Sequence, residues 1–328
     1  MDLIKELHQY LREDIQQVNE VIISSISSSD EELISLISNH LVKTGGKRIR
    51  PILTILVAKM FSYKGDKSIK LAAAIEFIHM ATLLHDDVVD GSKMRRFLPS
   101  ANIVWGNKAS ILVGDFLFSQ SFKLIVSTES LPALKVLSKA SAVIAEGEVS
   151  QLAKLEEQRI ITKEEYLKII NSKTAELFSA ACEVGAIIAG QDYNYCNLLQ
   201  GFGKLLGNIF QITDDVLDYF GSSTLAGKNI GEDFKEGKVT LPLIYLFKKL
   251  NSEEKKYLKN SLKEPIKPEE CYSWAKEEMI KHDIKTEIYN YLDGLKKQAI
   301  SYLEQISISS KDKDYLRSLV DFAISRSY

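Results

Sequence analysis

Two short acidic motifs set in apolar sequence constrain this chain more than any other feature. The first acidic motif, residues 86–90, reads DDVVD, and the second acidic motif, residues 214–218, reads DDVLD. In each motif the first and last acids are four residues apart, so on a helix they lie on one face, one turn from each other. Like charges at this spacing repel, and burying one is costly unless a cation neutralises it. The pattern predicts two helices, each with a cation at its acidic end.

A hard divalent cation fits these side chains best. The candidate ligands are Asp86, Asp87, Asp90, Asp214, Asp215 and Asp218. All of them are oxygen donors, and no set of Cys or His ligands accompanies them. Mg²⁺ is typically held by one or two carboxylates together with substrate phosphate oxygens. We therefore predict a Mg²⁺ site in which two facing helices hold one diphosphate.

Helix signals recur along the whole chain. Capping-box spacing occurs at Ser29 with Glu32, Thr162 with Glu165, and Asn251 with Glu254. Alternating strand-like runs bounded by hairpin turns are hard to find, and no low-complexity linker divides the sequence. We predict an all-α fold, a single domain over residues 1–328, with roughly ten or more helices of about 11–12 residues.

A glycine follows each acidic motif, Gly91 after the first and Gly221 after the second. Glycine at this position is typical of a helix C-terminus. Both motifs are therefore expected at the C-terminal ends of helices, where the helix dipole is unfavourable for carboxylates. A bound cation would relieve this effect as well as the repulsion between the acids.

Composition excludes several other classes of protein. Hydrophobic residues make up 45% of the chain and charged residues 26%, as in ordinary soluble proteins, and the formal net charge of −2 argues against nucleic-acid binding. The cysteines are Cys182, Cys196 and Cys271. They are too few and too scattered for a disulfide framework or a zinc site. With no visible signal peptide and no long uncharged apolar run, we expect a cytoplasmic protein.

Basic residues accompany the acids. The candidates are Lys47 and Arg50 in a glycine-opened loop, Arg95 and Arg96 after the first acidic motif, Lys173 beside Thr174, and Lys228 and Lys238 after the second. Taken alone, each of these cations could equally be an ordinary solvated surface residue. Taken alone, His79 would be interpreted as a core histidine and Gln211 as a surface amide. Together they exceed what one diphosphate needs. We predict two diphosphate sites, one bridged by metal and one held by basic side chains.

Nine short motifs share one known pattern. They are Gly46-Lys-Arg-Ile-Arg-Pro51, Glu76-Phe-Ile-His79, Leu84-His-Asp-Asp-Val-Val-Asp90, Met94-Arg-Arg96, Val113-Gly-Asp115, Ala145-Glu-Gly-Glu148, Ser172-Lys-Thr174, Phe210-Gln-Ile-Thr-Asp-Asp-Val-Leu-Asp218 and Gly237-Lys-Val-Thr240. In these motifs the chain resembles the trans-isoprenyl diphosphate synthases, most closely the bacterial long-chain octaprenyl type. The resemblance implies a helical bundle around a central cavity. One departure is Phe97, where the family usually has glycine.

The resemblance also implies a role for each candidate. Direct Mg²⁺ ligands would be Asp86, Asp90 and Asp214, with Asp87, Asp215 and Asp218 acting through water or as support. The allylic diphosphate would be held by Arg95, Lys173, Thr174, Gln211 and Lys228, with Lys238 nearby. Isopentenyl diphosphate would be held by Lys47, Arg50, His79 and Arg96. Farnesyl or geranylgeranyl diphosphate is the expected primer, and a homodimer with transient membrane contact for product release is the expected assembly.

The implied chemistry is physically sound. Metal ions and cations stabilise the charge that builds on a departing diphosphate, which leaves an allylic carbocation. The double bond of isopentenyl diphosphate attacks this carbocation, and a proton is then lost. No protein base is obvious in the sequence, so the released diphosphate is the expected proton acceptor.

Product length is predicted from the helix that reaches the first acidic motif. From Lys67 to Asp90 this helix would be roughly 34 Å long, and an extended five-carbon unit spans about one turn. Ala81 and Thr82, one turn before Asp86, are small, whereas short-chain relatives place aromatic residues there. These two residues would form the floor of the product cavity, and small side chains there would leave room for the chain to grow further. We therefore predict a long all-trans product of about eight units, about C40, within a range of roughly seven to ten. Such a product suits quinone side chains.

Three other functions remain open from the residues alone. A cyclase of the same fold would not need the second diphosphate site. A non-catalytic subunit would tend to lack some of the acids or cations, and none of those expected is missing. A helical scaffold with an incidental Mg²⁺ site would leave the basic residues unexplained.

Overall fold

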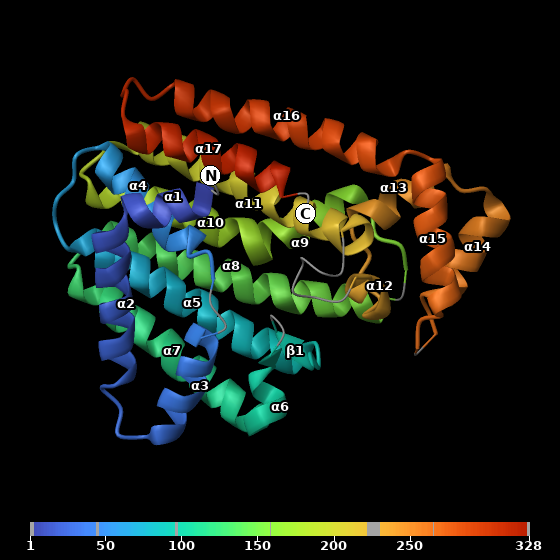
Figure 1. Cartoon of the computed structure of the whole chain (residues 1–328), viewed down its shortest axis with the longest axis horizontal. Helices are drawn as coiled ribbons and strands as arrows, with labels where there is room; N and C mark the ends of the chain where they lie inside the picture. Colours follow the sequence, from blue (N-terminus) through green and yellow to red (C-terminus); the bar gives the residue numbers. More distant parts are fainter. Residues whose placement is uncertain are drawn as a thin grey trace. The chain divides into compact units, whose positions relative to one another are not determined.

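The computed structural model describes residues 3–43, 46–95, 98–157, 159–221, 230–264 and 266–326, and it is mostly helical (Figure 1). Two predicted site residues, Arg96 and Lys228, lie outside the described residues, as does Phe97. The strands within the described part are β1 (Met94–Arg95) and β2 (Leu98–Pro99), which pair antiparallel. The prediction of an all-α fold is confirmed.

The described residues form the following helices in chain order. They are α1 (Leu3–Tyr10), α2 (Arg12–Ile26), α3 (Glu32–Lys43), α4 (Ile49–Met60), α5 (Lys67–Val89), α6 (Ala101–Trp105), α7 (Asn107–Ser127), α8 (Leu131–Glu156), α9 (Lys163–Ile170), the π-helical turn η1 (Asn171–Ala175), α10 (Glu176–Ile188), α11 (Tyr193–Phe220), α12 (Glu232–Lys235), α13 (Leu241–Lys249), α14 (Ser252–Ser261), α15 (Glu269–Lys281), α16 (Ile284–Glu304) and α17 (Lys311–Ser325).

Two of the three predicted capping boxes form as expected. Thr162 caps α9 and Asn251 caps α14, each with the reciprocal bond from the glutamate three residues later. The third does not start a helix at Ser29, because α3 begins only at Glu32. The Ser29 hydroxyl instead accepts a hydrogen bond from the backbone N–H of Glu31 at 3.2 Å. A local serine turn therefore replaces the predicted cap.

The chain groups into two compact units, each assembled from segments far apart in sequence. Unit 1 comprises Met1–Ser141, Leu177–Gly203 and Ser301–Leu319. Unit 2 comprises Ala142–Glu176, Lys204–Ile300 and Val320–Tyr328. The first acidic motif belongs to unit 1 and the second to unit 2. The single domain over residues 1–328 stays a prediction.

Helix α5 is the centre of unit 1. It packs against α2, α4 and most extensively α7, and its middle, Leu71–Ile75, is fully buried (Figure 1). A run of small residues there allows neighbouring helices to approach on several sides. The helix ends at Val89 with Asp90 as its C-cap, and Gly91 takes the left-handed conformation with φ +63°. The predicted position of the first acidic motif at a helix C-terminus is confirmed.

The part of helix α11 that belongs to unit 2, from Lys204 onwards, carries the second acidic motif in its last two turns. Tyr219 and Phe234 are fully buried and cluster with Tyr272, which fixes the end of α11 beside α12 and α15. Helix α13 packs against α9 and α15, and α14 packs against α15 (Figure 1). The second motif therefore also ends a helix, as predicted.

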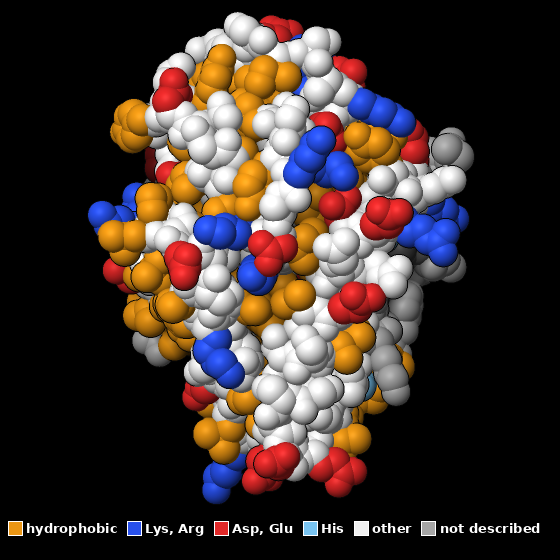
Figure 2. Space-filling model, turned by 90° about the vertical axis from the view of Figure 1, so that its left-hand side faces the viewer, with side chains coloured by type: hydrophobic (Ala, Val, Ile, Leu, Met, Phe, Trp, Pro, Cys, Tyr) orange, Lys and Arg blue, Asp and Glu red, His pale blue; other side chains and the backbone are white. Residues whose placement is uncertain are grey.

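The surface drawn in Figure 2 mixes basic, acidic and apolar side chains. Among the described residues, those of α7 include exposed large apolar side chains, for example Ile111, Leu112 and Val126. Within α7, an 18-residue window has a mean hydropathy of 1.4 and is 39% buried, so by length and composition alone this helix is apolar enough to cross a membrane. Core helices of soluble proteins meet the same criterion.

Candidate functional site

Arg95 neutralises the middle acid of the first acidic motif. Asp87 is fully buried, and its two carboxylate oxygens accept hydrogen bonds from Arg95 Nε at 2.9 Å and Arg95 Nη2 at 2.6 Å. Such two-point contacts between guanidinium and carboxylate are strong and directional. Asp86 and Asp90 remain partly exposed on the neighbouring face of α5. The motif thus has one acid held inside the protein and two that reach solvent.

A short hairpin positions this arginine. Arg95 lies in β1 opposite Leu98 of β2. The Ser100 hydroxyl donates to the Ser92 carbonyl at 2.5 Å, and Asn102 Nδ2 donates to the carbonyls of Asp87 at 3.0 Å and Ser92 at 3.2 Å. These bonds tie both ends of the hairpin to the end of α5. The structure therefore places Arg95 on Asp87, whereas its predicted partner was the allylic diphosphate.

Gly114 of α7 allows a close approach to His85. A Cβ atom at Gly114 would lie only 2.3 Å from His85 Nε2, so no larger residue fits there without movement. His85 Nε2 lies 3.2 Å from the Ile111 carbonyl and 3.5 Å from Asp115 Oδ1. The Val-Gly-Asp sequence on α7 therefore supports the imidazole that precedes the first acidic motif.

The three described residues predicted for isopentenyl diphosphate all belong to unit 1. Lys47 precedes α4, Arg50 is in its first turn, and His79 is on α5, which packs against α4. All three side chains are partly exposed. The Arg50 guanidinium lies 4.6 Å from the centroid of the Phe178 ring, a cation–π contact that limits its motion. Packing of α4 on α5 therefore brings the start of α4 and the middle of α5 into one unit.

Uncharged groups hold the middle acid of the second acidic motif. Asp215 is buried, and it accepts hydrogen bonds from the Tyr166 hydroxyl at 2.6 Å and from Gln211 Nε2 at 2.8 Å. The Thr174 hydroxyl donates to Gln211 Oε1 at 2.8 Å. Burial raises the pKa of Asp215 to about 7, although the bonds from Tyr166 and Gln211 act in the opposite direction. Two predicted diphosphate contacts, Thr174 and Gln211, are thereby linked to the acidic motif.

Arg326, near the C-terminus, is paired with the leading acid of the second motif. Its Nη1 donates to Asp214 Oδ1 at 2.8 Å and its Nη2 to the Phe210 carbonyl at 2.7 Å, while the guanidinium lies 3.6 Å from the centroid of the Phe210 ring. The Arg326 side chain is only 4% exposed, whereas that of Asp214 is 46% exposed. A positive charge therefore already sits on a carboxylate that was predicted to bind a metal. Sequence reasoning missed Arg326, because a lone arginine far from the motifs carries no signal.

Asp218 has a different task from Asp214. Its carboxylate accepts the backbone N–H groups of Glu232 at 3.2 Å and Asp233 at 3.1 Å, which are the first residues of α12. The Gly231 N–H donates to the Asp218 carbonyl at 2.9 Å. A carboxylate at these N–H groups caps the helix and complements its dipole. Asp218 therefore fixes the start of α12 beside the end of α11.

Lys173 and Thr174 lie in the π-helical turn η1, a feature that recurs at functional sites. Gly147 of α8 lies against this turn, and a Cβ atom there would be 2.5 Å from Ser172 Cβ. Lys173 Nζ contacts Glu148 Oε2 at 2.7 Å. Lys238 Nζ likewise contacts Glu236 Oε2 at 2.7 Å. Both predicted lysines are thus paired with acids in this structure.

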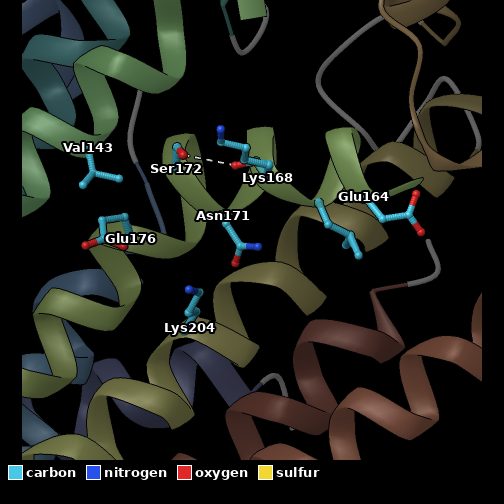
Figure 3. A pocket seen from close by; sticks show the side chains of 8 residues that line it. Val143, Glu164, Lys168, Asn171, Ser172, Glu176 and Lys204 are labelled. Atoms are coloured by element: carbon cyan, nitrogen blue, oxygen red, sulfur yellow. Dashed lines mark hydrogen bonds between the residues drawn. The ribbon is translucent and has the colours of Figure 1, made fainter. Parts of the chain in front are cut away.

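The pocket in Figure 3 borders the first residues of η1, Asn171 and Ser172, and has a volume of about 490 Å³. Its lining residues are Val143, Glu164, Leu167, Lys168, Asn171, Ser172, Glu176 and Lys204. None of the predicted site residues is among them. The Ser172 hydroxyl is directed to the Lys168 carbonyl at 3.1 Å (Figure 3). We assign this pocket no role in the predicted chemistry.

The two predicted chain-length residues lie on α5 as expected. Ala81 is buried, and Thr82 is partly buried with its hydroxyl donating to the His79 carbonyl at 2.8 Å. Among the described residues, no group of three or more His, Cys, Asp or Glu side chains is gathered in a way that could hold a metal. The donor chemistry nonetheless fits a hard cation, because Asp86, Asp90 and Asp214 present carboxylate oxygens that are at least partly exposed.

Comparisons with known proteins agree on one family of enzymes. A family model described as polyprenyl synthetase matches residues 31–279. An octaprenyl diphosphate synthase of Haemophilus influenzae is 38% identical and the alignment covers 99% of this chain and 98% of that protein. A decaprenyl diphosphate synthase structure from Rhodobacter capsulatus matches with a TM-score of 0.92 and 40% identity, covering 99% of both chains. A polyprenyl synthase from Caulobacter crescentus, complexed with calcium and isoprenyl diphosphate, matches with a TM-score of 0.88 and 40% identity, covering 99% of this chain and 98% of that one.

Proposed function

The chain belongs to the polyprenyl synthetase family and is a trans-polyprenyl diphosphate synthase with the all-α isoprenoid synthase fold, and on that premise we propose its product. It extends an allylic diphosphate with isopentenyl diphosphate to an all-trans chain of about eight five-carbon units, about C40, that serves as a quinone side chain. The primer is farnesyl or geranylgeranyl diphosphate. Relatives named for octaprenyl and decaprenyl products support a long chain without fixing its length.

One observation carries the proposed use of Mg²⁺. Asp214 is 46% exposed at a helix end, and Asp86 and Asp90 are partly exposed, so the carboxylate oxygens of all three are accessible to a cation from solvent. We propose that Asp86, Asp90 and Asp214 hold Mg²⁺, which would neutralise charge on the departing diphosphate. The relative crystallised with calcium and isoprenyl diphosphate supports a hard, oxygen-bound cation.

The remaining acids position the groups around them. Asp215 orients Gln211, which in turn accepts the bond from Thr174, so both polar side chains are held ready for the allylic diphosphate. Lys173 and Lys238 would add positive charge to the same diphosphate, and Lys228 and Arg95 are proposed to assist. Preorganised cations of this kind stabilise the charge that develops on the leaving group.

The second diphosphate belongs to isopentenyl diphosphate. We propose that Lys47, Arg50 and His79 hold it, together with Arg96. Holding both substrates in fixed orientations converts the attack of the double bond on the allylic carbon into an intramolecular step. The proton lost afterwards passes to the released diphosphate.

Incorporation of isopentenyl diphosphate onto a farnesyl primer, with and without Mg²⁺, tests the reaction, and mass spectrometry of the products gives their length. Ala81→Phe should shorten the products markedly, because an aromatic ring at this level of α5 would block the growing chain. Thr82→Ser serves as the control, since it keeps a small polar side chain. An unchanged product distribution in Ala81→Phe would contradict the proposed floor.

We further propose a cytoplasmic homodimer that touches a membrane only to release its product. The exposed apolar residues of α7, with Leu112 67% and Val126 60% exposed, are suited to contact a second copy. Sedimentation of the wild type should give the mass of a dimer, and Leu112→Glu should shift it towards a monomer. A monomeric wild type would contradict this assembly. Flotation with liposomes, before and after product formation, tests the membrane contact.

A further inference from the structure

A buried ion pair joins the basic loop before α4 to the middle of α5. Arg48 Nη1 contacts Glu76 Oε1, and the two side chains are only 11% and 8% exposed. The residues are 28 positions apart in sequence and both belong to unit 1. Neither charge is tolerated at such depth without the other. The pair therefore fixes the distance between the loop and α5.

The backbone conformation at Arg48 does not favour an arginine, so the reason for an arginine at this position lies in the contact that its side chain makes. Arg48 has φ +50° and ψ +35°, the left-handed region that favours glycine. It occupies the N-cap position of α4 without any side-chain cap, and its carbonyl accepts the Ile52 N–H at 3.0 Å. A glycine would adopt this backbone more easily but would leave Glu76 unpaired. Strained residues of this kind persist where the surrounding structure requires them.

The ion pair lies among the residues proposed for isopentenyl diphosphate. Lys47 directly precedes Arg48, and Arg50 follows it in the first turn of α4. Glu76 is three residues before His79, so the two lie on one face of α5, one turn apart. One contact thus ties together the two elements that carry all three of these side chains.

We propose that Arg48 and Glu76 are positioning residues for the isopentenyl diphosphate site. Their ion pair sets the place of Lys47 and Arg50 relative to His79, and neither residue touches the substrate itself. Buried ion pairs often add little stability compared with apolar packing, whereas they specify one arrangement of the groups around them. This inference rests on the proposed function, because it assigns a purpose to the geometry of that site.

Steady-state kinetics of Glu76→Gln and Arg48→Gln test the proposal. Each variant should raise KM for isopentenyl diphosphate about tenfold or more, while KM for the allylic diphosphate changes less than about twofold. A merely structural defect would not separate the two substrates. Glu76→Asp, which keeps the charge, should recover part of the loss. In the double variant the two losses should not add, because both remove the same contact.

The matched control is Lys59→Gln at the other end of α4, which breaks the ion pair between Lys59 Nζ and Asp14 Oδ2, 2.8 Å apart. It should leave both KM values unchanged. Calorimetric binding of isopentenyl diphosphate alone to folded Glu76→Asp gives a second measurement if the glutamine variants do not fold. Equal effects on both substrates, or none, would overturn the positioning role. An inactive wild type would instead refute the proposed function.

Discussion

Asp87 in the first acidic motif and Asp215 in the second occupy the same place in nearly identical sequences, and both are buried. Arg95 holds Asp87 with two charged hydrogen bonds, whereas Asp215 is held by the neutral side chains of Tyr166 and Gln211. Arg95 neutralises the negative charge of Asp87, whereas the surroundings of Asp215 favour its protonated form. The same local pattern therefore needs different support, depending on which residues the fold brings beside it.

The leading acids can be compared as well. Asp214 is 46% exposed and is paired with Arg326, which comes from the far end of the chain, and Asp86 is partly exposed on α5. If both acids hold metal, replacing either one should impair catalysis. Replacing one acid, or one supporting group, at a time should show how far the two motifs differ in function and stability.

The largest effect is expected from Asp86→Asn and Asp214→Asn. Each should lower kcat about 100-fold or more, because each removes a negatively charged ligand for the metal that stabilises the leaving diphosphate. Asp293→Asn is the control, since that acid forms an exposed ion pair with Lys297 at 2.7 Å on α16. Full turnover in either variant would show that the two motifs do not share the metal.

The next largest difference is expected in the free energy of unfolding, which should depend more on the charged partner of Asp87 than on the neutral partners of Asp215. Arg95→Gln leaves a buried carboxylate without its cation and should destabilise the protein by about 3–5 kcal/mol. Tyr166→Phe removes one hydrogen bond to Asp215 and should cost only about 1–3 kcal/mol. Chemical denaturation of the Mg²⁺-free protein measures both.

Two controls belong with these variants. Arg159→Gln breaks exposed ion pairs with Glu157 and Glu165 and should change the free energy of unfolding far less than Arg95→Gln does, because solvent screens exposed pairs. Tyr193→Phe changes a tyrosine that is highly exposed and should have almost no effect. Equal losses in Arg95→Gln and Tyr166→Phe would contradict the electrostatic distinction between the motifs.

The smallest effect is a difference in pH dependence. Burial raises the pKa of Asp215 from 3.8 to about 7, so between these values the folded protein holds a proton that the unfolded chain has lost. The free energy of unfolding therefore falls as the pH rises through this window. Asp215→Asn lacks this titration. In the presence of a metal chelator, the stability of the wild type relative to Asp215→Asn should decrease from about pH 4 to about pH 7. Parallel curves would mean that Asp215 stays ionised.

Patterns within a few residues were predictable. The helical class, the capping boxes at Thr162 and Asn251, and the helix ends at Gly91 and Gly221 all follow from spacing and from backbone preferences. Ser29 was the exception, because its hydroxyl bonds to a nearby N–H before the helix begins. Local signals fail where two local arrangements compete for one polar group.

The partners of the acids were not predictable in the same way. Tyr166 and Arg326 are single residues, each far in sequence from the acid that it contacts, and no spacing rule connects them. Arg95 was recognised, but its contact with Asp87 was not. Such pairings depend on how the elements pack within each unit, which no single stretch of sequence contains.

The helical class, the two helices that end in acids, and the family of this protein can all be predicted from sequence alone, since helix periodicity, capping and motif spacing are local properties. The partner of each acid follows from the fold: Arg95 for Asp87, Arg326 for Asp214, and the neutral Tyr166 for Asp215. Electrostatic and hydrogen-bond contacts act over a few ångströms, and packing determines which residues come that close.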